Sequence, residues 1–444
     1  MKEIREKYRV LTVLLLLLSF NNVDVLALGL MLQDIKHDLA MTDTQLGLLT
    51  GLAFAFFYSF MGLPLARWAD RGNRVTIISL TTAVWGIAVF LCGFARSFLQ
   101  LLTIRIGAAV GEAGCIPTGN SLLADYFGRA ERPKAAAIYM LGGPISIFIG
   151  YFGAGWMNEY FGWRTTFMLL GVPGLLLSVI SRFALKEPRL AQAPVAAAAP
   201  TESQEPGLKE VCRTLWANFT FRQLLITYPV MAFFGYGILQ WQPAFFVRSY
   251  GLSTGELGTW LAVLNGVFGL IGTYGGGWLA TRYAAKNERL QLRAMAILYV
   301  LTGVVTTFVY LSSNLYVSFV MIALSLIIGA VTNGPLFAVI QTLVPQRMRA
   351  ISIALVMLLA NLVGMGLGPL AAGALSDAFT PLLGQESLRY ALAALCPGYL
   401  WGAFHVWRAS RTVGRDLSSL VDSDDEQGVR QGNGHDSGRY TCAG

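Results

Sequence analysis

Twelve long apolar segments, separated by short polar connections, dominate this sequence of 444 residues. A helix that crosses a bilayer needs about 20 mostly apolar residues, and each segment reaches that length. A helix also satisfies its own backbone hydrogen bonds, which a bilayer interior requires. The sequence therefore predicts an all-α integral membrane protein. The expected spans are residues 8–31, 44–66, 75–95, 98–125, 134–157, 164–186, 219–247, 254–281, 290–312, 315–343, 350–376 and 387–409.

Composition supports this class and excludes others. Only 13% of the residues are charged, whereas soluble proteins have about 25%. The net charge of +8 arises from cations in the short connections, so we expect no nucleic-acid partner. Five cysteines without paired spacing indicate neither disulfides nor zinc. The first apolar run continues to Met31 without a small-residue cleavage site, which favours an uncleaved first span over a signal peptide.

The spans form two groups of six. We expect a first half over residues 1–186, a Pro/Ala/Glu/Ser-rich cytoplasmic linker over 187–218, a second half over 219–410 and a disordered tail over 411–444. The halves resemble each other: Arg164 precedes a Pro-Gly pair in the sixth span, and Arg389 precedes another in the twelfth. A duplicated six-helix unit gives two halves related by an axis along the membrane normal, with the binding site between them.

The positive charges predict the orientation. Twenty-five Lys and Arg residues lie in the connections on the side of the N-terminus, and five lie on the other side. Positive connections stay in the cytoplasm. Both termini are therefore expected in the cytoplasm, with a bacterial plasma membrane as the expected location.

The fourth span carries two opposite charges. Arg105 and Glu112 are seven residues apart, nearly two helical turns, so they project from one face about 10 Å apart. Ionisable groups at bilayer depth face a partner or a polar cavity because exposure to lipid costs several kcal/mol. Glycines on the same span allow close helix packing. Together these features predict a packed bundle around a polar pathway.

The connection after the second span reads Ala66-Arg-Trp-Ala-Asp-Arg-Gly-Asn-Arg. It resembles the cytoplasmic loop signature of the major facilitator superfamily, Gly-x-Leu-Ala-Asp-Arg-x-Gly-Arg-Arg. The departures from that signature are Ala66, Trp68, Asn73 and Val75.

The resemblance implies a role for Asp70, Arg71 and Arg74 as a latch that holds the two halves in the outward-facing state. A carboxylate at a helix end accepts hydrogen bonds from basic groups and helix N-terminal amides. In the second half Thr281 stands where the aspartate would be, so the latch is expected to be asymmetric. An ordinary solvated turn is the alternative.

Further motifs resemble the spinster branch of this superfamily. They are Arg105-(x)6-Glu112-Ala-Gly-Cys, Ser121-Leu-Leu-Ala-Asp-Tyr-Phe, Ala137-Ile-Tyr-Met-Leu-Gly, Phe161-Gly-Trp-Arg and Gly368-Pro-Leu. The resemblance implies twelve helices and a proton-coupled carrier working by alternating access, and the better-known animal members move lysophospholipids or sphingosine phosphate. One departure matters: Val25 follows Asp24 where the branch has arginine.

We therefore expect Asp24, Arg105 and Glu112 to form one proton-coupling group beside the substrate cavity. Counted from the span centres, Asp24 and Arg105 lie at similar depth, so Arg105 is the natural partner of Asp24. Burial strengthens a carboxyl's hold on a proton and a nearby guanidinium weakens it. Glu112 is the first choice as proton carrier and Asp24 the second. The alternative is a permanent ion pair that only locks helices.

Other polar residues within spans are candidates for substrate contacts, although interfacial anchoring or interhelical hydrogen bonding explains each equally well. They are Arg105, Tyr58, Asn120, Tyr139, Tyr236, Gln240, Trp241, Asn265, Asn333 and Asn361. Asp34, His37 and Asp38 have helical spacing but lack further ligands, so no metal site is expected.

The predicted function is transport of an amphipathic or lipid-like anionic solute, with protons and membrane lipids as the other partners. We expect a monomer without a cofactor. The competing interpretation is a facilitator or symporter of small organic anions with Arg105 as the substrate's counter-ion. A non-transporting receptor or an enzyme is disfavoured, since the sequence offers no catalytic constellation and no long soluble domain.

Overall fold

The computed structural model describes residues 2–191, 208–283, 287–345 and 348–436. Every regular element in these ranges is a helix. The helices of the first half are α1 (Lys2–Asn21), α2 (Val23–Leu39), α3 (Asp43–Gly47), η1 (Leu48–Leu52), α4 (Ala53–Arg71), α5 (Arg74–Cys92), α6 (Phe98–Glu112), α7 (Cys115–Tyr126), α8 (Arg132–Met140), α9 (Gly142–Ile147), η2 (Phe148–Gly153) and α10 (Ala154–Ala184).

Two short helices follow, and then the second half. The helices between the halves are α11 (Pro188–Ala191) and α12 (Leu208–Ala217). Those of the second half are α13 (Phe219–Tyr250), α14 (Thr254–Val263), η3 (Leu264–Phe268), α15 (Gly269–Tyr283), α16 (Glu288–Leu311), α17 (Leu315–Thr342), α18 (Arg349–Leu359), η5 (Ala360–Leu367), α19 (Gly368–Leu383), η6 (Gly384–Glu386), α20 (Ser387–Leu395) and α21 (Gly398–Asp436).

The described chain crosses a membrane twelve times, as the sequence predicted. Ten helical runs are long and apolar enough to do so. Two of them contain two crossings each, because the runs 132–184 and 351–418 have 53 and 68 residues and one crossing needs about 20. The first of these runs turns back at Gly162, with φ of 75°, and the second at Gly384, with φ of 53°. Glycine adopts this left-handed backbone without strain.

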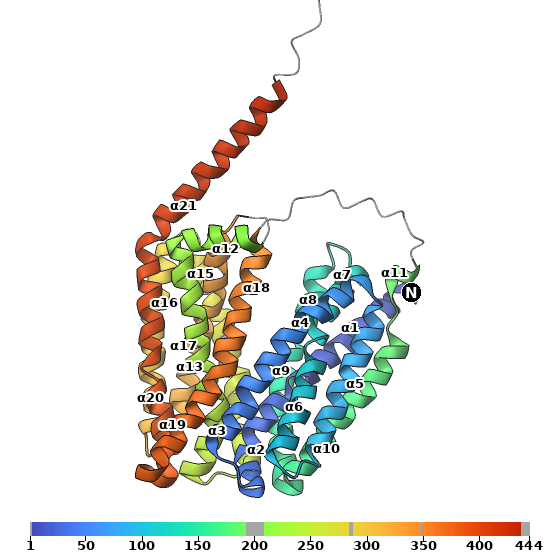
Figure 1. Ribbon diagram of the computed structural model, residues 1–444, viewed down its shortest axis with the longest axis vertical. Helices are drawn as coiled ribbons and strands as arrows, with labels where there is room; N and C mark the ends of the chain where they lie inside the picture. The colour runs from blue at the N-terminus through green and yellow to red at the C-terminus, as the bar shows by residue number, and fades with distance from the viewer. Residues whose placement is uncertain (1, 192–207, 284–286, 346–347, 437–444) are drawn as a thin grey trace, which may run out of the picture.

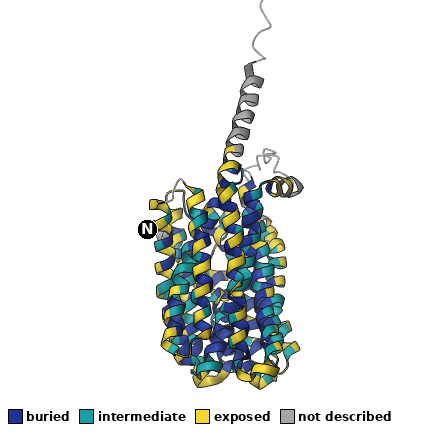
Figure 2. Cartoon of the chain, turned by 90° about the vertical axis from the view of Figure 1, so that its left-hand side faces the viewer, coloured by how far each residue is buried: buried dark blue, intermediate teal, exposed yellow. Residues whose placement is uncertain are grey.

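The helices gather into two groups, α1–α10 and α13–α21, which stand side by side in Figure 1. The groups converge at the lower end of the view and separate towards the upper end, where the N-terminus and α12 lie. We call the lower end the closed end and the upper end the open end. Large apolar side chains such as Phe183 and Leu301 are exposed, and Figure 2 shows exposed residues along the outer surface of the bundle. Such a surface suits contact with lipid tails.

Glycines bring the two halves into backbone contact towards the closed end. A Cβ atom added to Gly51 in η1 would lie 2.5 Å from the carbonyl oxygen of Gly366 in η5. A Cβ atom on Gly155 would lie 2.5 Å from the carbonyl oxygen of Thr254. No real side chain tolerates that distance, so any larger residue at these positions has to push the halves apart.

Several spans are interrupted within the membrane. The first span breaks at Asn22, between α1 and α2, and the fourth breaks at Ala113 and Gly114, between α6 and α7. The second, fifth, eighth and eleventh spans each contain a π-helical segment, η1, η2, η3 and η5. Such segments are rare and often lie at functional sites. The sequence had not led us to expect these interruptions.

The structure differs from the predicted boundaries at two places. Within the predicted linker, α11 and α12 are additional helices at the open end. At the other boundary, α21 continues past residue 410 because its next turns pack on α13: Val413 is buried, and Asp416 accepts a 2.9 Å hydrogen bond from the backbone N–H of Thr220. Residues 411–418 are therefore an ordered part of the second half.

Candidate functional site

A buried ion pair joins the first and fourth spans. The Arg105 guanidinium donates to Oδ2 of Asp24, while the indole N–H of Trp85 donates to Oδ1 at 3.1 Å. Asp24 is fully buried and Arg105 is 1% exposed. The guanidinium carbon lies 5.0 Å from the ring centre of Phe54, a cation–π distance. Both oxygens of the Asp24 carboxylate therefore have a donor.

The break at Asn22 explains the place of Asp24. The break starts a new helix at Val23, and Asp24 lies in its first turn, where unpaired backbone N–H groups favour a negative charge. The structure brings Asp24 and Arg105 together, as their estimated depths predicted. The charged partner of Asp24 is thus Arg105, which belongs to another helix.

Glu112 lies close by at the other break, as the last residue of α6. Its Oε1 accepts a 3.1 Å hydrogen bond from the amide of Asn21, and the contact is buried. Its Oε2 is also buried and has no hydrogen-bond partner in the described part of the chain. A cavity of about 10 Å³, lined in part by Asn21, Thr82 and Cys115, adjoins Glu112. That volume suits about one water molecule.

Asp24 and Glu112 are therefore held by neighbouring turns of the first span rather than by one shared arginine. Asn21 at the end of α1 binds Glu112, and Asp24 at the start of α2 binds Arg105. Asn22, the break itself, separates them. A change in the angle between α1 and α2 would therefore move Asn21, the partner of Glu112, relative to Asp24.

The main cavity of the described chain has a volume of about 670 Å³ and lies mostly in the second half, between α13, α15, α16 and α17. Pro144 and Ile147 of α9 contribute from the first half. No charged residue lines it. Its polar lining consists of Tyr228, Tyr236, Gln242, Asn265, Thr273, Tyr299, Thr302, Thr306, Ser325, Thr332 and Tyr399.

Only two of the predicted substrate contacts, Tyr236 and Asn265, line this cavity. Trp241 is buried and donates a 2.8 Å hydrogen bond to the carbonyl oxygen of Pro369, so it holds α13 against α19. The side chain of Asn333 lies outside the described residues. The other uncharged candidates do not line this cavity: Tyr58, Asn120 and Tyr139 of the first half, and Gln240 and Asn361 of the second.

The three charged candidates, Asp24, Arg105 and Glu112, do not line this cavity either. The expectation that they lie beside the substrate cavity stays a prediction, since none of the three lines the 670 Å³ cavity. Asp24 belongs to α2, and Arg105 and Glu112 belong to α6. Their hydrogen-bond partners from other helices, Asn21 of α1 and Trp85 of α5, also belong to the first half.

Of the three predicted latch residues, Arg74 makes its contacts within the first half. Arg74 is buried, pairs with Glu187, and reaches Asp125 at 2.7 Å. Burial alone would raise the pKa of the Glu187 carboxyl, but the hydrogen bonds and charge of Arg74 hold that pKa below its ordinary value of about 4.5. Arg71 is exposed, and the side chain of Asp70 lies outside the described residues.

The acidic residues of the predicted first external loop lie in α2 and serve as hydrogen-bond acceptors. Asp34 accepts a 2.5 Å hydrogen bond from the amide of Asn158, and Asp38 accepts one of 2.9 Å from the indole of Trp163 and pairs with Arg164. These contacts hold span 1 to spans 5 and 6.

Sequence reasoning missed a group of charged residues at the closed end, centred on Asp43 and Arg248. Their ion pair joins the two halves. One feature of the sequence could have pointed to Arg248: it is one of only five Lys and Arg residues in the connections on its side of the membrane.

Comparisons with known proteins agree with this architecture. A family model described as Major Facilitator Superfamily matches residues 12–369. An "MFS-type efflux pump" of Mycolicibacterium smegmatis is 32% identical over 93% of this chain and 95% of its own length. A "Probable sulfoacetate transporter SauU" of Cupriavidus necator is 27% identical over 67% of this chain and 70% of its own.

Among solved structures, the chain is similar to a bacterial homologue of the human lysosomal transporter Spinster in an inward-facing, unoccupied conformation. The TM-score is 0.82 with 28% identity, over 93% of this chain and 98% of that one.

Proposed function

The chain belongs to the spinster-like branch of the major facilitator superfamily and is a membrane transporter, and we propose that its transport is coupled to protons. We further propose that it moves an amphipathic or lipid-like anionic solute by alternating access. The observation that carries the proposal is the buried, half-satisfied carboxyl of Glu112 next to the Asp24–Arg105 pair. An ionisable group inside a membrane bundle is expensive to maintain, so it points to a function.

Glu112 is the proposed proton carrier. A proton on Oε2 would remove the charge of a carboxyl whose only described hydrogen bond comes from the neutral amide of Asn21. The adjoining 10 Å³ cavity offers space for one water to deliver or remove that proton. Asp24 is the second candidate, since it is the other buried carboxylate of this group.

The second-half cavity supports an amphipathic substrate. Ligand pockets commonly have volumes of about 300–1,000 Å³ and a mostly apolar lining with a few placed polar groups. The cavity of about 670 Å³ falls in that range, and tyrosine, threonine and aliphatic side chains line it. Such walls suit an acyl chain or another apolar group. The anionic character of the substrate rests on the branch resemblance alone, because no charged residue lines this cavity.

The orientation is part of the proposal. Since connections rich in Lys and Arg stay in the cytoplasm, the open end of the molecule would face the cytoplasm of a bacterium and this state would be inward-facing. The similarity to an inward-facing structure supports that assignment. We further propose that the carrier functions as a monomer.

The test is proton flux into proteoliposomes, measured with an entrapped pH dye while lysolipids and small organic acids are added in turn. We expect one class to trigger proton movement in the wild type and not in Glu112→Gln, which should still fold because its amide oxygen can accept from Asn21. Glu131→Gln is the matched control, since Glu131 is exposed and pairs with Lys7. Unchanged proton movement in Glu112→Gln would contradict the assignment of the carrier.

A carrier of small organic anions is the second candidate, favoured by the similarity to the probable sulfoacetate transporter. In that mechanism Arg105 would bind the substrate carboxylate or sulfonate. Because Asp24 already pairs with Arg105, the substrate would have to displace Asp24. Transport of small acids, but not of lysolipids, in the same proteoliposomes would favour this candidate.

A further inference from the structure

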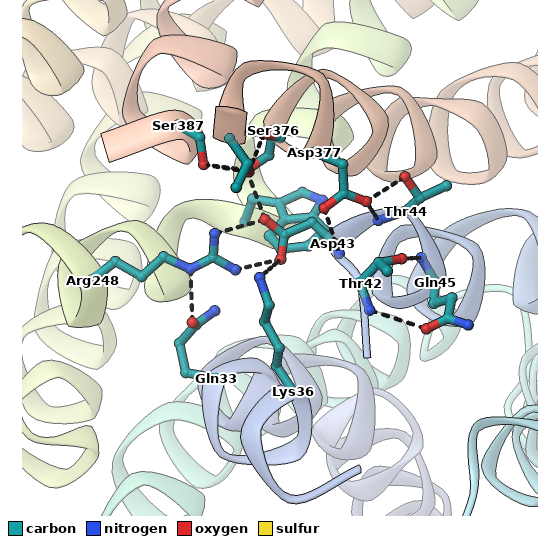
Figure 3. Close-up of polar contacts among 12 residues, drawn as sticks. Gln33, Lys36, Thr42, Asp43, Thr44, Gln45, Arg248, Ser376, Asp377 and Ser387 are labelled. Atoms are coloured by element: carbon teal, nitrogen blue, oxygen red, sulfur yellow. Dashed lines mark hydrogen bonds and ion pairs between the residues drawn. The ribbon is translucent and has the colours of Figure 1, made fainter. Parts of the chain in front are cut away.

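A buried network of charges joins the two halves at the closed end (Figure 3). Asp43, the first residue of α3, is fully buried. Its carboxylate accepts two hydrogen bonds from Arg248 at 2.7 and 2.5 Å, one from Ser376 at 2.7 Å and one from Lys36 at 2.7 Å. Arg248 also donates to Gln33 at 2.7 Å. One carboxylate of the first half therefore holds two segments of the second half, the end of α13 and the middle of α19.

A second carboxylate, from the second half, binds donors of the first half. Asp377 of α19 accepts hydrogen bonds from the backbone N–H groups of Asp43 and Thr44, at 3.0 and 2.7 Å, and from the Thr44 hydroxyl at 2.6 Å. These N–H groups begin a helix that continues through η1 and α4, and helix N-termini carry unpaired donors and a partial positive charge. The second half thus supplies an anion to the start of a long helix in the first half.

The two sets together make seven hydrogen bonds across the interface. Their charges balance, with Asp43 and Asp377 against Lys36 and Arg248. Removing Asp43 would leave Lys36 and Arg248 with excess positive charge in a site that is largely closed to water. Because truncating one partner of a buried, hydrogen-bonded ion pair is costly, the interface should then lose much of its stability.

We propose that Gln33, Lys36, Asp43, Arg248, Ser376 and Asp377 form a latch that keeps the closed end shut, and that opening of this end requires Asp43 and Asp377 to leave the opposite half. The latch is distinct from the Asp70 loop, which lies at the other end of the molecule. The proposal also goes beyond the proton coupling proposed above, since the latch would control opening of the closed end whichever solute is carried. A bundle that separated freely at this end would not need two carboxylates that each bind across the interface.

The test measures the distance between the halves directly. Spin labels at His37→Cys and Leu382→Cys, both exposed at the closed end and one in each half, are introduced into a background without the native cysteines. Pulsed electron–electron resonance in lipid nanodiscs then gives the populations of short and long distances. In the otherwise unchanged protein we expect the short distance to dominate.

Asp43→Asn is expected to raise the ratio of the long-distance to the short-distance population by at least about tenfold. Arg248→Gln and Asp377→Asn should act in the same direction, and they carry the test if Asp43→Asn does not fold. Asp38→Asn is the matched control, because Asp38 is an acidic residue at the same end whose partners, Trp163 and Arg164, belong to its own half.

Unchanged distance populations in the three folded latch variants would overturn the proposal, as would an equal shift in Asp38→Asn. The measurement needs neither substrate nor a proton gradient. Its failure is therefore separate from a failure of the proposed transport function.

Discussion

Removing one member of the Asp24–Arg105 pair should destabilise the protein much more than removing both. Asp24 is fully buried and Arg105 is 1% exposed, so neither charge can recover contact with water after the loss of its partner. In Arg105→Gln, Asp24 would keep the Trp85 N–H as its donor; in Asp24→Asn, the guanidinium would keep the face of Phe54. Breaking a buried ion pair in this way costs about 3–5 kcal/mol.

The double variant Asp24→Asn/Arg105→Gln leaves no buried charge, and its two amides can bond to each other. We therefore expect an interaction energy of about 3 kcal/mol, which is the amount by which the sum of the single effects exceeds the double effect. The assay is unfolding by a denaturing detergent in mixed micelles, followed by circular dichroism. Additive single effects, or single effects below about 1 kcal/mol, would refute the buried-pair account.

Transport assays on the wild type, the two single variants and the double variant distinguish a structural role of the pair from a role in proton coupling. If the pair only locks spans 1 and 4 together, the double variant should regain transport along with stability. If Asp24 or Arg105 takes part in coupling, the double variant should be folded and inactive. The exposed pair of Lys7 and Glu131, 2.9 Å apart, provides a control cycle in which additive behaviour is expected.

Three further predictions address other parts of the molecule. Gly51→Ala should hinder closure and increase the long-distance population of the spin-label experiment several-fold, whereas Gly62→Ala, with nothing within 4 Å of the added Cβ, should not. Glu187→Gln should flatten the pH dependence of thermal stability in acid. Because Arg74 holds the pKa of Glu187 below about 4.5, the stabilisation by Glu187 is complete above that pH and is lost as the pH falls through the lowered pKa. If the melting temperatures of the wild type and of Glu187→Gln fell equally between pH 7 and pH 3, this prediction would be contradicted. Tyr236→Ala should raise the KM for the transported solute about tenfold with a smaller effect on maximal rate, and an unchanged KM in transport assays would remove the cavity from the substrate path.

The number of crossings was predictable because bilayer thickness imposes it. A membrane interior fixes the length and composition of each span, so the pattern is readable without knowledge of tertiary contacts. The depth of a residue in the membrane was also predictable, because the rise of a helix per residue is constant. This rise placed Asp24 at about the depth of Arg105. The structure then paired them.

Contacts between residues on different helices were not predictable in this way. Asp43 and Arg248 are 205 residues apart, and their contact depends on which helices meet and on the state in which the halves meet. The second-half cavity was missed for a related reason. Residues such as Thr302, Thr306 and Ser325 are unremarkable within apolar spans, and only the packing of α16 and α17 turns them towards one space.

The location of the charged residues limits the mechanisms that can couple protons to transport. Asp24, Arg105 and Glu112 all lie in the first half, and so does Asn21. If the two halves only rocked as rigid bodies, none of the contacts among these residues would change. The proton affinities of the two carboxyls would then differ between the two states only through their contact with water and with the second half.

A rearrangement inside the first half would increase this difference, and the helix breaks are where it can occur at low cost. The break at Asn22 separates the residue that binds Glu112 from the one that binds Arg105. Beyond it, α2 carries Asp24 in its first turn and the latch residues Gln33 and Lys36 near its other end. If opening of the closed end lets α2 tilt about this break, the tilt would shift Asp24 relative to Glu112. The latch and the proton site would then be coupled through one helix without any contact between them.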